Sequence, residues 1–278
     1  MGLPSRQTGA IALLLLAAAG AARAEPEVRI GAIAGAVTYR ESASIRPLRS
    51  RWDGPFVGLA GSGTFRFPES LVSLRLRGDL WTTPDRTEAW REDGERVQTN
   101  DLGVTGLSAG ADLVLPLASE PGLRGLLGAT WQFQNFRRDR FELRGRPDQI
   151  RTGRVDENVS VLALGGGAEA DLPLGRGWTW RVGARADIVV WSEASNTALG
   201  TIRGDGGMLL TAESHLEWAL GGDRRLFLGL GWHLQDLRGD SRDTTARLGP
   251  DLRIPVTIEW PDNRLTQLYA AGGLRLEF

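Results

Sequence analysis

Apolar and charged residues alternate along much of the chain with a period of two, and this feature restricts its fold more than any other. Between Trp178 and Val190 one parity is apolar, while the other carries Arg181, Arg185 and Asp187. Successive side chains of a β-strand point to opposite faces, whereas a helix repeats about every 3.6 residues. The pattern therefore predicts an all-β protein whose strands have one apolar face and one charged face.

The same alternation, bounded by turn residues, defines eleven candidate strands. They span 27–42, 53–67, 70–83, 99–116, 123–138, 156–173, 178–193, 207–220, 225–238, 248–260 and 265–278. Long polar connections alternate with tight turns between them, which is the rhythm of successive antiparallel hairpins in a single sheet.

Strands of this kind occur in water-soluble barrels with a dry core and in membrane barrels with a polar interior. The candidates here are about 13 to 18 residues long, against a usual 5 or 6, which favours a tilted crossing of a membrane. We therefore predict a single antiparallel up-and-down transmembrane β-barrel. Its interior is predicted to hold a network of opposite charges made by Arg75, Arg77, Asp79, Asp112, Arg181, Arg185, Asp187, Glu213, Glu217 and Arg275.

Eleven strands do not fit such a barrel, because bacterial single-chain barrels have an even number. Segment 248–260 contains Pro250 and Pro255 and is followed by Pro261, and proline interrupts the hydrogen bonding of a central strand. We predict that this segment folds back outside the membrane and leaves ten strands. The alternatives are that 27–42 does not span, or that the barrel has eight or twelve strands.

Tryptophans gather near the ends of the candidate strands. Trp81 and Trp191 precede long connections, and Trp178, Trp218 and Trp260 adjoin tight turns. This placing predicts an aromatic girdle at the two membrane surfaces. Trp191 is an exception because it has the parity of the interior face.

Both ends of the chain carry export features. Arg6 precedes an apolar run over 10–19, and Ala22-Arg23-Ala24 has the small-x-small pattern of a cleavage site. Residues 1–24 are therefore predicted to be a cleaved signal peptide, with 25–278 forming the barrel. The apolar run is about ten residues, half of what a membrane-spanning helix needs.

The last strand alternates and ends with Leu274, Leu276 and Phe278. It resembles the C-terminal signal of bacterial outer-membrane β-barrel proteins, which ends in an aromatic residue. The resemblance covers the whole mature chain and implies a location in the outer membrane of a Gram-negative bacterium. It also implies insertion by the barrel assembly machinery, contact with outer-membrane lipid and lipopolysaccharide, and long loops on the outside.

Composition removes several other functions. The chain has 34 acidic and 33 basic residues, so it lacks the basic surplus that nucleic-acid binding requires. It has no cysteine, which excludes disulfides and thiolate metal sites, and every basic side chain is arginine, which excludes lysine chemistry. We predict no cofactor.

Two histidines, His215 and His233, are the candidates for catalysis. Ser214 precedes His215, but neighbours on a strand face opposite ways, so the two cannot form a nucleophile–base pair. The sequence also lacks the His and Ser two apart of the phospholipase and deacylase barrels and the Asp–His pairing of the omptin type. We predict an interior polar role for both histidines and leave enzymatic activity unassigned.

Two further groups of residues could bind ligands. Glu213, His215 and Glu217 share one face, but alternate strand residues are about 7 Å apart, which is loose for one metal ion, and we predict no metal. Seven arginines between 137 and 154 could contact lipopolysaccharide phosphates. Acidic residues interleave with these arginines, so we favour a solvated loop whose charges nearly cancel.

The sequence thus predicts an integral outer-membrane barrel that acts as a structural or interaction protein or as a narrow, porin-like passive pore. Two other hypotheses stay open. One is a barrel-embedded hydrolase of lipid A or phospholipid that uses His215 or His233, and the other is a soluble periplasmic lipid-binding barrel. The sequence identifies neither a ligand nor an oligomeric state.

Overall fold

The computed structural model of the chain describes residues 25–43, 47–67, 70–119, 122–144, 146–151, 153–197, 200–247 and 253–278. The predicted signal peptide, residues 1–24, lies outside the described residues. None of the described residues belongs to a helix long and apolar enough to cross a membrane.

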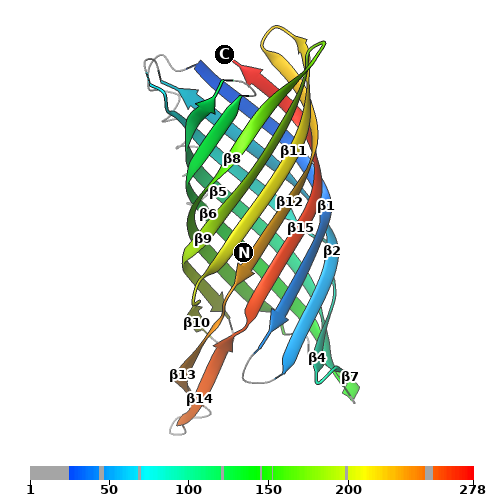
Figure 1. The fold of residues 1–278 in the computed structure, drawn as a ribbon. Helices are drawn as coiled ribbons and strands as arrows, with labels where there is room; N and C mark the ends of the chain where they lie inside the picture. Colours follow the sequence, from blue (N-terminus) through cyan, green and yellow to red (C-terminus); the bar gives the residue numbers. More distant parts are fainter. Residues whose placement is uncertain are drawn as a thin grey trace.

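Fifteen strands account for most of the described chain (Figure 1). They are β1 (Glu25–Ser42), β2 (Leu48–Arg66), β3 (Ser73–Thr82), β4 (Arg86–Glu92), β5 (Glu95–Ala118), β6 (Leu123–Leu143), β7 (Arg146–Arg151), β8 (Val155–Gly175), β9 (Trp178–Asn196), β10 (Gly200–Arg203), β11 (Gly207–Gly221), β12 (Arg224–Leu237), β13 (Asp240–Arg247), β14 (Arg253–Trp260) and β15 (Asp262–Glu277).

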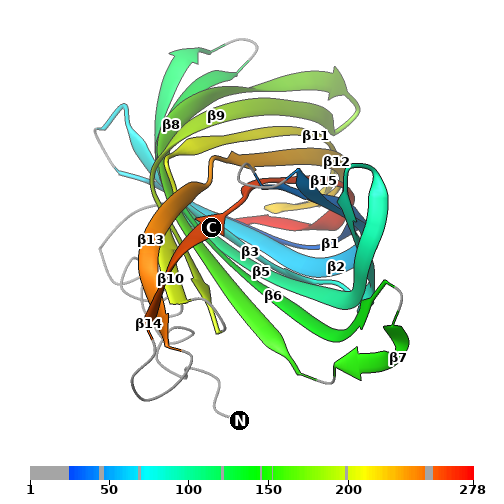
Figure 2. The same cartoon turned by 90° about the horizontal axis from the view of Figure 1, so that it is seen from below.

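Ten of these strands form the wall of a closed antiparallel barrel: β1, β2, β3, β5, β6, β8, β9, β11, β12 and β15. Each pairs with the next, and the ring closes where β1 pairs with β15, from Glu27 opposite Glu277 to Ser42 opposite Asp262. Seen along the axis, the strands surround a single lumen (Figure 2). The predicted ten-stranded up-and-down barrel is confirmed, and the alternatives of eight and twelve strands are wrong.

The described part of segment 248–260 does not enter the wall, as predicted. This part, β14, pairs only with β13, and this two-stranded hairpin projects from one end of the barrel (Figure 1). Pro255 lies opposite Thr245 in the hairpin, where β14 has a free edge and a residue without an N–H is tolerated. Residues 248–252, including Pro250, lie outside the described residues.

The two ends of the barrel differ. The turn end carries the short connections β2–β3, β5–β6, β8–β9 and β11–β12 together with both described termini, where the Phe278 N–H donates to the Pro26 carbonyl over 3.1 Å. The loop end carries the short strands β4, β7 and β10 and the β13–β14 hairpin. There β4 continues the place of β3 in the wall, because it also pairs with β2 and β5.

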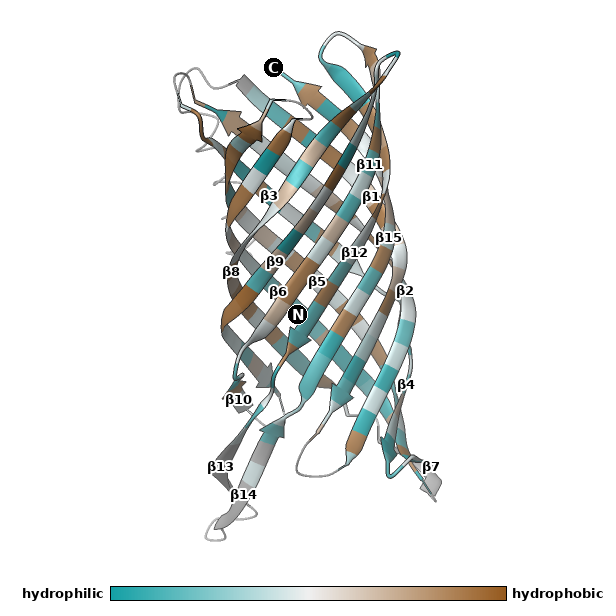
Figure 3. Cartoon of the chain, viewed as in Figure 1, coloured by the Kyte–Doolittle hydropathy of each residue, from teal (hydrophilic) through white to brown (hydrophobic). Residues whose placement is uncertain are grey.

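Hydropathy alternates along the wall strands (Figure 3), and exposed apolar side chains occur on the outer face of each of them. Each wall strand contributes an outward aliphatic side chain that is 40% exposed or more. We call this set the apolar belt: Ile30, Leu59, Leu80, Leu113, Leu127, Leu164, Ile188, Leu216, Leu228 and Leu268. An exposed apolar surface of this extent suits contact with lipid and not with water.

The tryptophan prediction was right for some residues and wrong for others. Trp178 and Trp218 lie outside near the turn end, exposed by 38% and 45%, and their rings stack with centroids 5.7 Å apart. Trp81 instead shares the parity of Arg75 and Arg77, so it faces the lumen and is 5% exposed. Trp260 is also buried, at the base of the loop-end hairpin.

Trp191 lies outside despite its interior parity. Ala163 pairs with Val189 and Leu162 pairs with Trp191, so β9 has one extra residue, Val190, at a β-bulge. The bulge shifts the alternation by one position, and Val190 and Trp191 are both exposed, by 54% and 37%. A simple count of parity cannot detect such an insertion.

An arginine in place of Leu228 tests whether the belt faces lipid. Leu228 is 69% exposed on the outer face, and we expect Leu228→Arg to lower the free energy of unfolding in lipid vesicles by about 2–4 kcal/mol. Leu71→Arg is the control, since Leu71 is 81% exposed in the β2–β3 connection. Urea unfolding followed by heat-shifted gel mobility measures both, and equal, small effects would argue against a lipid-facing belt.

Candidate functional site in the barrel lumen

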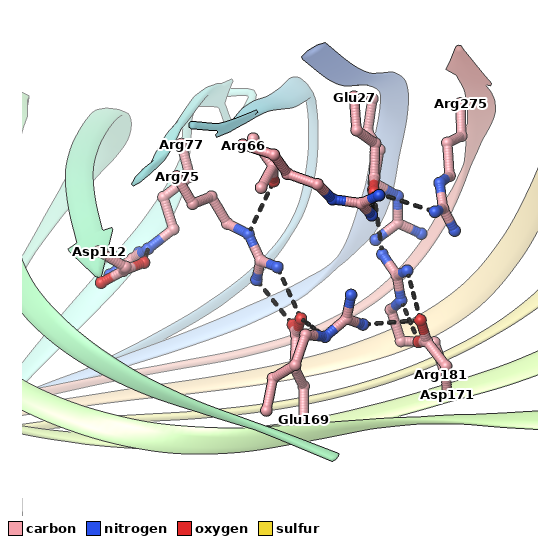
Figure 4. A network of polar contacts seen from close by, with 12 residues as sticks. Glu27, Arg66, Arg75, Arg77, Asp112, Glu169, Asp171, Arg181 and Arg275 are labelled. Carbon is pink, nitrogen blue, oxygen red and sulfur yellow. Dashed lines mark hydrogen bonds and ion pairs between the residues drawn. The ribbon is translucent and has the colours of Figure 1, made fainter. Parts of the chain in front are cut away.

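Ion pairs fill the lumen near the turn end. We call this set the basal network: Glu27, Arg29, Arg75, Arg124, Glu169, Asp171, Arg181, Glu217 and Arg275. The guanidinium of Arg75 donates to both oxygens of Glu169, over 2.7 and 2.6 Å, and that of Arg181 donates to both oxygens of Asp171, over 2.6 and 2.9 Å (Figure 4). Such forked pairs are the strongest form of this contact.

Glu217 of β11 connects arginines of two other strands, β1 and β15, within the basal network. Its carboxylate is fully buried and accepts from Arg29 over 2.9 Å and from Arg275 over 2.6 Å. Arg275 also donates to Glu27 over 2.9 Å, and Arg181 reaches Glu27 over 3.4 Å. The strands β1, β9, β11 and β15 are therefore tied together through side chains inside the barrel.

A second group of charges lies next to the basal network, toward the loop end. Arg77 donates to Asp112 over 3.0 Å, and Arg185 contacts Asp187 at 2.8 Å and also donates to Asp112. Thr130 accepts from Arg77 over 2.6 Å. Two arginines and two aspartates thus neutralise one another at this level.

A cavity of about 210 Å³ lies in the lumen beside these charges. Asp79 and Glu213 line it, and neither forms an ion pair with any described residue. Asp79 accepts a hydrogen bond from Ser108, and Glu213 accepts one from the Tyr269 hydroxyl over 3.0 Å. The ring of Tyr269 lies across Gly231, where any Cβ would come within 2.2 Å of it, so a glycine is required there.

Both histidines also line the cavity, and no serine is among their described contacts. His233 contacts Gln132 through Nε2 and Thr211 through Nδ1, each over 3.2 Å. His215 faces the ring of Phe227 edge-on, with centroids 5.6 Å apart. Ser214 lies on the outer face, as its parity predicts, and accepts from the Trp180 indole over 2.9 Å.

Beyond the cavity the lumen becomes apolar, which the sequence prediction of a charged interior missed. Its inward side chains are almost wholly buried and include Tyr39, Phe56, Trp81, Phe136, Leu209 and Leu265. At this level Gln134 and Gln235 exchange two amide hydrogen bonds across the lumen, over 2.7 and 3.0 Å. The charged interior is therefore interrupted by an apolar layer.

A third charged group, the rim cluster, closes the loop end. Arg138 lies among Glu41, Glu88 and Glu157, at 2.9, 2.9 and 3.5 Å. Arg40 and Ser42, which flank Glu41, are exposed and polar, so this cluster stands outside the apolar belt. Burial, reinforced by Glu157 and Glu88 and opposed by Arg138, raises the pKa of Glu41 to about 7.

The structure distributes the ten predicted lumen residues over three places. Four lie in the basal network, four lie in the second group of charges, and Asp79 and Glu213 line the cavity. Sequence reasoning missed Glu27, Arg29, Arg124, Glu169 and Asp171, as well as the rim cluster. Except for Glu88, they follow the inward parity of candidate strands, so a complete reading of parity would have found them. Glu88 lies on β4, which the sequence analysis did not predict as a strand.

Two predicted groups remain, the C-terminal pattern and the possible metal ligands. Leu274 and Phe278 point outward near the end of β15, exposed by 44% and 70%, and Leu276 shares their parity. Glu213, His215 and Glu217 have separate contacts, and within the described residues no three metal-ligating side chains gather around one point.

Among solved structures, the chain is similar to the outer membrane protease OmpT from Escherichia coli, with a TM-score of 0.63 and 12% identity over 91% of this chain and 97% of that one. The chain has the fold of an outer-membrane β-barrel. Weaker matches include the translocator domain of NalP from Neisseria meningitidis (TM-score 0.38, 12% identity, 97% and 95% covered). The transport unit of AIDA-I from Escherichia coli also matches (TM-score 0.42, 10% identity, 97% and 98% covered). No family model and no curated protein sequence matches.

Removing the charge of Glu217 tests the basal network. Glu217→Gln leaves Arg29 and Arg275 short of a counter-charge in a buried place, and we expect it to lower the free energy of unfolding by about 3 kcal/mol or more. Glu213→Gln is the matched control on the same strand face, where one hydrogen bond of about 1 kcal/mol is at stake. Similar losses in urea unfolding would refute the role given to Glu217.

The rim cluster gives a pH dependence with a definite sign. Between the ordinary pKa of a glutamate and about pH 7, Glu41 keeps its proton in the folded chain and has lost it in the unfolded chain. This group therefore favours the fold at low pH, and its contribution is lost as pH rises through that window. We expect the melting temperature of the wild type to fall relative to Glu41→Gln between pH 5 and 8, whereas parallel curves would contradict the assignment.

Proposed function

We propose that this chain is an integral outer-membrane barrel that conducts no ions and acts as a structural or interaction protein. One observation carries the proposal, which is that side chains bridge opposite walls at four levels of the lumen. The bridges are Arg75 to Glu169, Arg185 to Asp112, Gln134 to Gln235, and Arg138 to Glu41. Two or three wall strands lie between the partners of each bridge, so each crosses the lumen.

Several features support a place in the outer membrane. The fold is that of outer-membrane barrels, the belt is apolar around the whole ring, and Leu274, Leu276 and Phe278 alternate in and just after β15. Export through a cleaved signal peptide and insertion by the barrel assembly machinery belong to the same proposal. The loop end would then face outward, with β4, β7, β10 and the β13–β14 hairpin available to partners (Figure 1).

A planar-bilayer recording tests the closed lumen. The chain is refolded in detergent, and heat-shifted gel mobility establishes that it is folded. We expect no discrete current steps, because an ion would have to break charged bridges and cross an apolar layer. The paired variant Arg75→Ala with Glu169→Ala should also be silent, since three further bridges remain. Reproducible steps from the folded wild type would overturn the proposal and favour the porin-like alternative.

The hydrolase alternative has a weaker basis. His233 is engaged through both ring nitrogens, and His215 contacts an aromatic ring, so neither has a serine in reach among its described contacts. Turnover of lipid A and of phospholipid by the wild type, His215→Ala and His233→Ala decides it, and turnover that depends on either histidine would revive it. The soluble alternative requires a polar outer face, and recovery of the chain in the soluble periplasmic fraction would support it.

A further inference from the structure

Three arginines lie directly opposite one another on the outer face at the loop end. Arg40 of β1 pairs in register with Arg264 of β15 on one side and with Arg51 of β2 on the other. All three side chains are exposed and have the outward parity of their strands. Opposed side chains in an antiparallel pair have Cβ atoms about 4.5–5.5 Å apart, so like charges placed there repel and destabilise the sheet.

This arginine row stands at the edge of the apolar belt. On β15 only Thr266 separates Arg264 from Leu268 along the outward face, and Leu268 is 60% exposed. On β1, Thr38 separates Arg40 from Ala36 in the same way. If the belt spans the hydrocarbon, the row lies at the height of the lipid headgroups.

Three arginines of the row face two paired acids, of which Asp53 also interacts with Arg40, so an excess of one positive charge remains. Arg51 pairs with Asp53 over 2.8 Å and Arg264 with Asp236 over 3.0 Å. Arg40, in the centre, has no carboxylate within ion-pair distance among the described residues. A second row, Arg49 opposite Arg91 opposite Arg96, begins two residues farther along β2 and adds three exposed arginines.

The arginines around the third long loop differ in this respect. Arg137 pairs with Asp85 at 2.5 Å, Arg140 with Asp101 at 3.2 Å, and Arg154 with Asp156 at 2.7 Å. Arg144 pairs with Glu95, and Arg138 turns inward to the rim cluster. The five arginines of this group whose side chains are described are therefore neutralised, and an excess of positive charge lies on β15, β1 and β2 instead.

We propose that the outer face of β15, β1 and β2 binds the phosphate groups of a phosphorylated lipid headgroup, with Arg40 at the centre of the site. A phosphate between opposed guanidinium groups accepts forked hydrogen bonds and converts their repulsion into attraction. The apolar belt directly below would hold the acyl chains of the same molecule. The site depends on the barrel standing in a membrane, but not on the lumen being closed.

The test uses Arg40→Gln, which removes the central charge and keeps an outward polar side chain. In zwitterionic detergent we expect the variant to melt about 2–4 °C above the wild type, because the repulsion within the row is relieved. When bisphosphorylated lipid A is added to the micelles, we expect the order to reverse, with the wild type the more stable. Native mass spectrometry should show lipid binding weakened about tenfold or more in the variant.

Controls separate this site from general effects of charge. Arg40→Lys keeps the charge without the fork and should bind with intermediate affinity. Arg224→Gln removes an exposed arginine at the turn end and should respond to lipid A as the wild type does. Inorganic phosphate at the same concentration should not reverse the order, and if it does, the site takes free anions and not a lipid.

An unchanged order for Arg40→Gln with lipid A present would overturn the proposal. This result is independent of the bilayer recording, because a conducting barrel could still bind lipid through its outer face. If Leu228→Arg does not destabilise the barrel and lipid A does not reverse the melting order of Arg40→Gln, the barrel does not stand in a membrane.

Discussion

The pairing of β1 with β15 is the contact on which the rest of the structure depends. In a hydrocarbon layer an unpaired backbone N–H or C=O has no water to bind, so a sheet can stand there only if it has no edge. The two strands pair from Glu27 opposite Glu277 to Ser42 opposite Asp262, which covers nearly the full length of both. Because β1 and β15 pair antiparallel, the start of β1 and the end of β15 lie at the same end of the barrel. The strands β13 and β14 form a separate hairpin outside the ring.

Closure with ten strands creates a second constraint, which is how to fill the lumen. Inward positions alternate with the lipid-facing ones, so the interior must be packed by side chains from all strands at once. Arginine suits this task because its long side chain and forked donors reach two acceptors on different strands. Arg181 contacts Asp171 on one side and Glu27 on the other, and Arg185 contacts Asp187 and Asp112. Glycine supplies the room, as where Gly231 lets Tyr269 lie flat against β12.

Sequence reasoning gave the fold well because period two, hairpin rhythm and proline placement are properties of single segments. It gave the inward parity of Arg75, Arg181 and Glu217 for the same reason. It could not give the partner of each charge, because Arg75 meets Glu169 across the lumen and no local signal links them. It also misplaced Trp191, because a one-residue bulge is invisible to alternation.

The apolar layer was missed for another reason. Tyr39 and Phe136 have inward parity but apolar character, and a pattern of alternation alone assigns apolar residues to lipid. Their position becomes clear only when the register is known. Tyr39 of β1 and Phe136 of β6 come from separate parts of the ring, and their ring centroids meet 4.6 Å apart in the lumen. The interior is thus polar near the turn end, apolar above the cavity and polar again at the rim.

The absence of lysine makes the distribution of arginine informative. Inside the barrel, arginines are balanced by carboxylates, as the cost of burying a lone charge requires. Around the third long loop, the exposed arginines whose side chains are described are also balanced, although water would have tolerated them alone. On the outer face, the row centred on Arg40 and the neighbouring row of Arg49, Arg91 and Arg96 set like charges in register with fewer acids beside them. Because opposed guanidinium groups repel one another, this face is where the proposed anion from outside the chain would stabilise the sheet most.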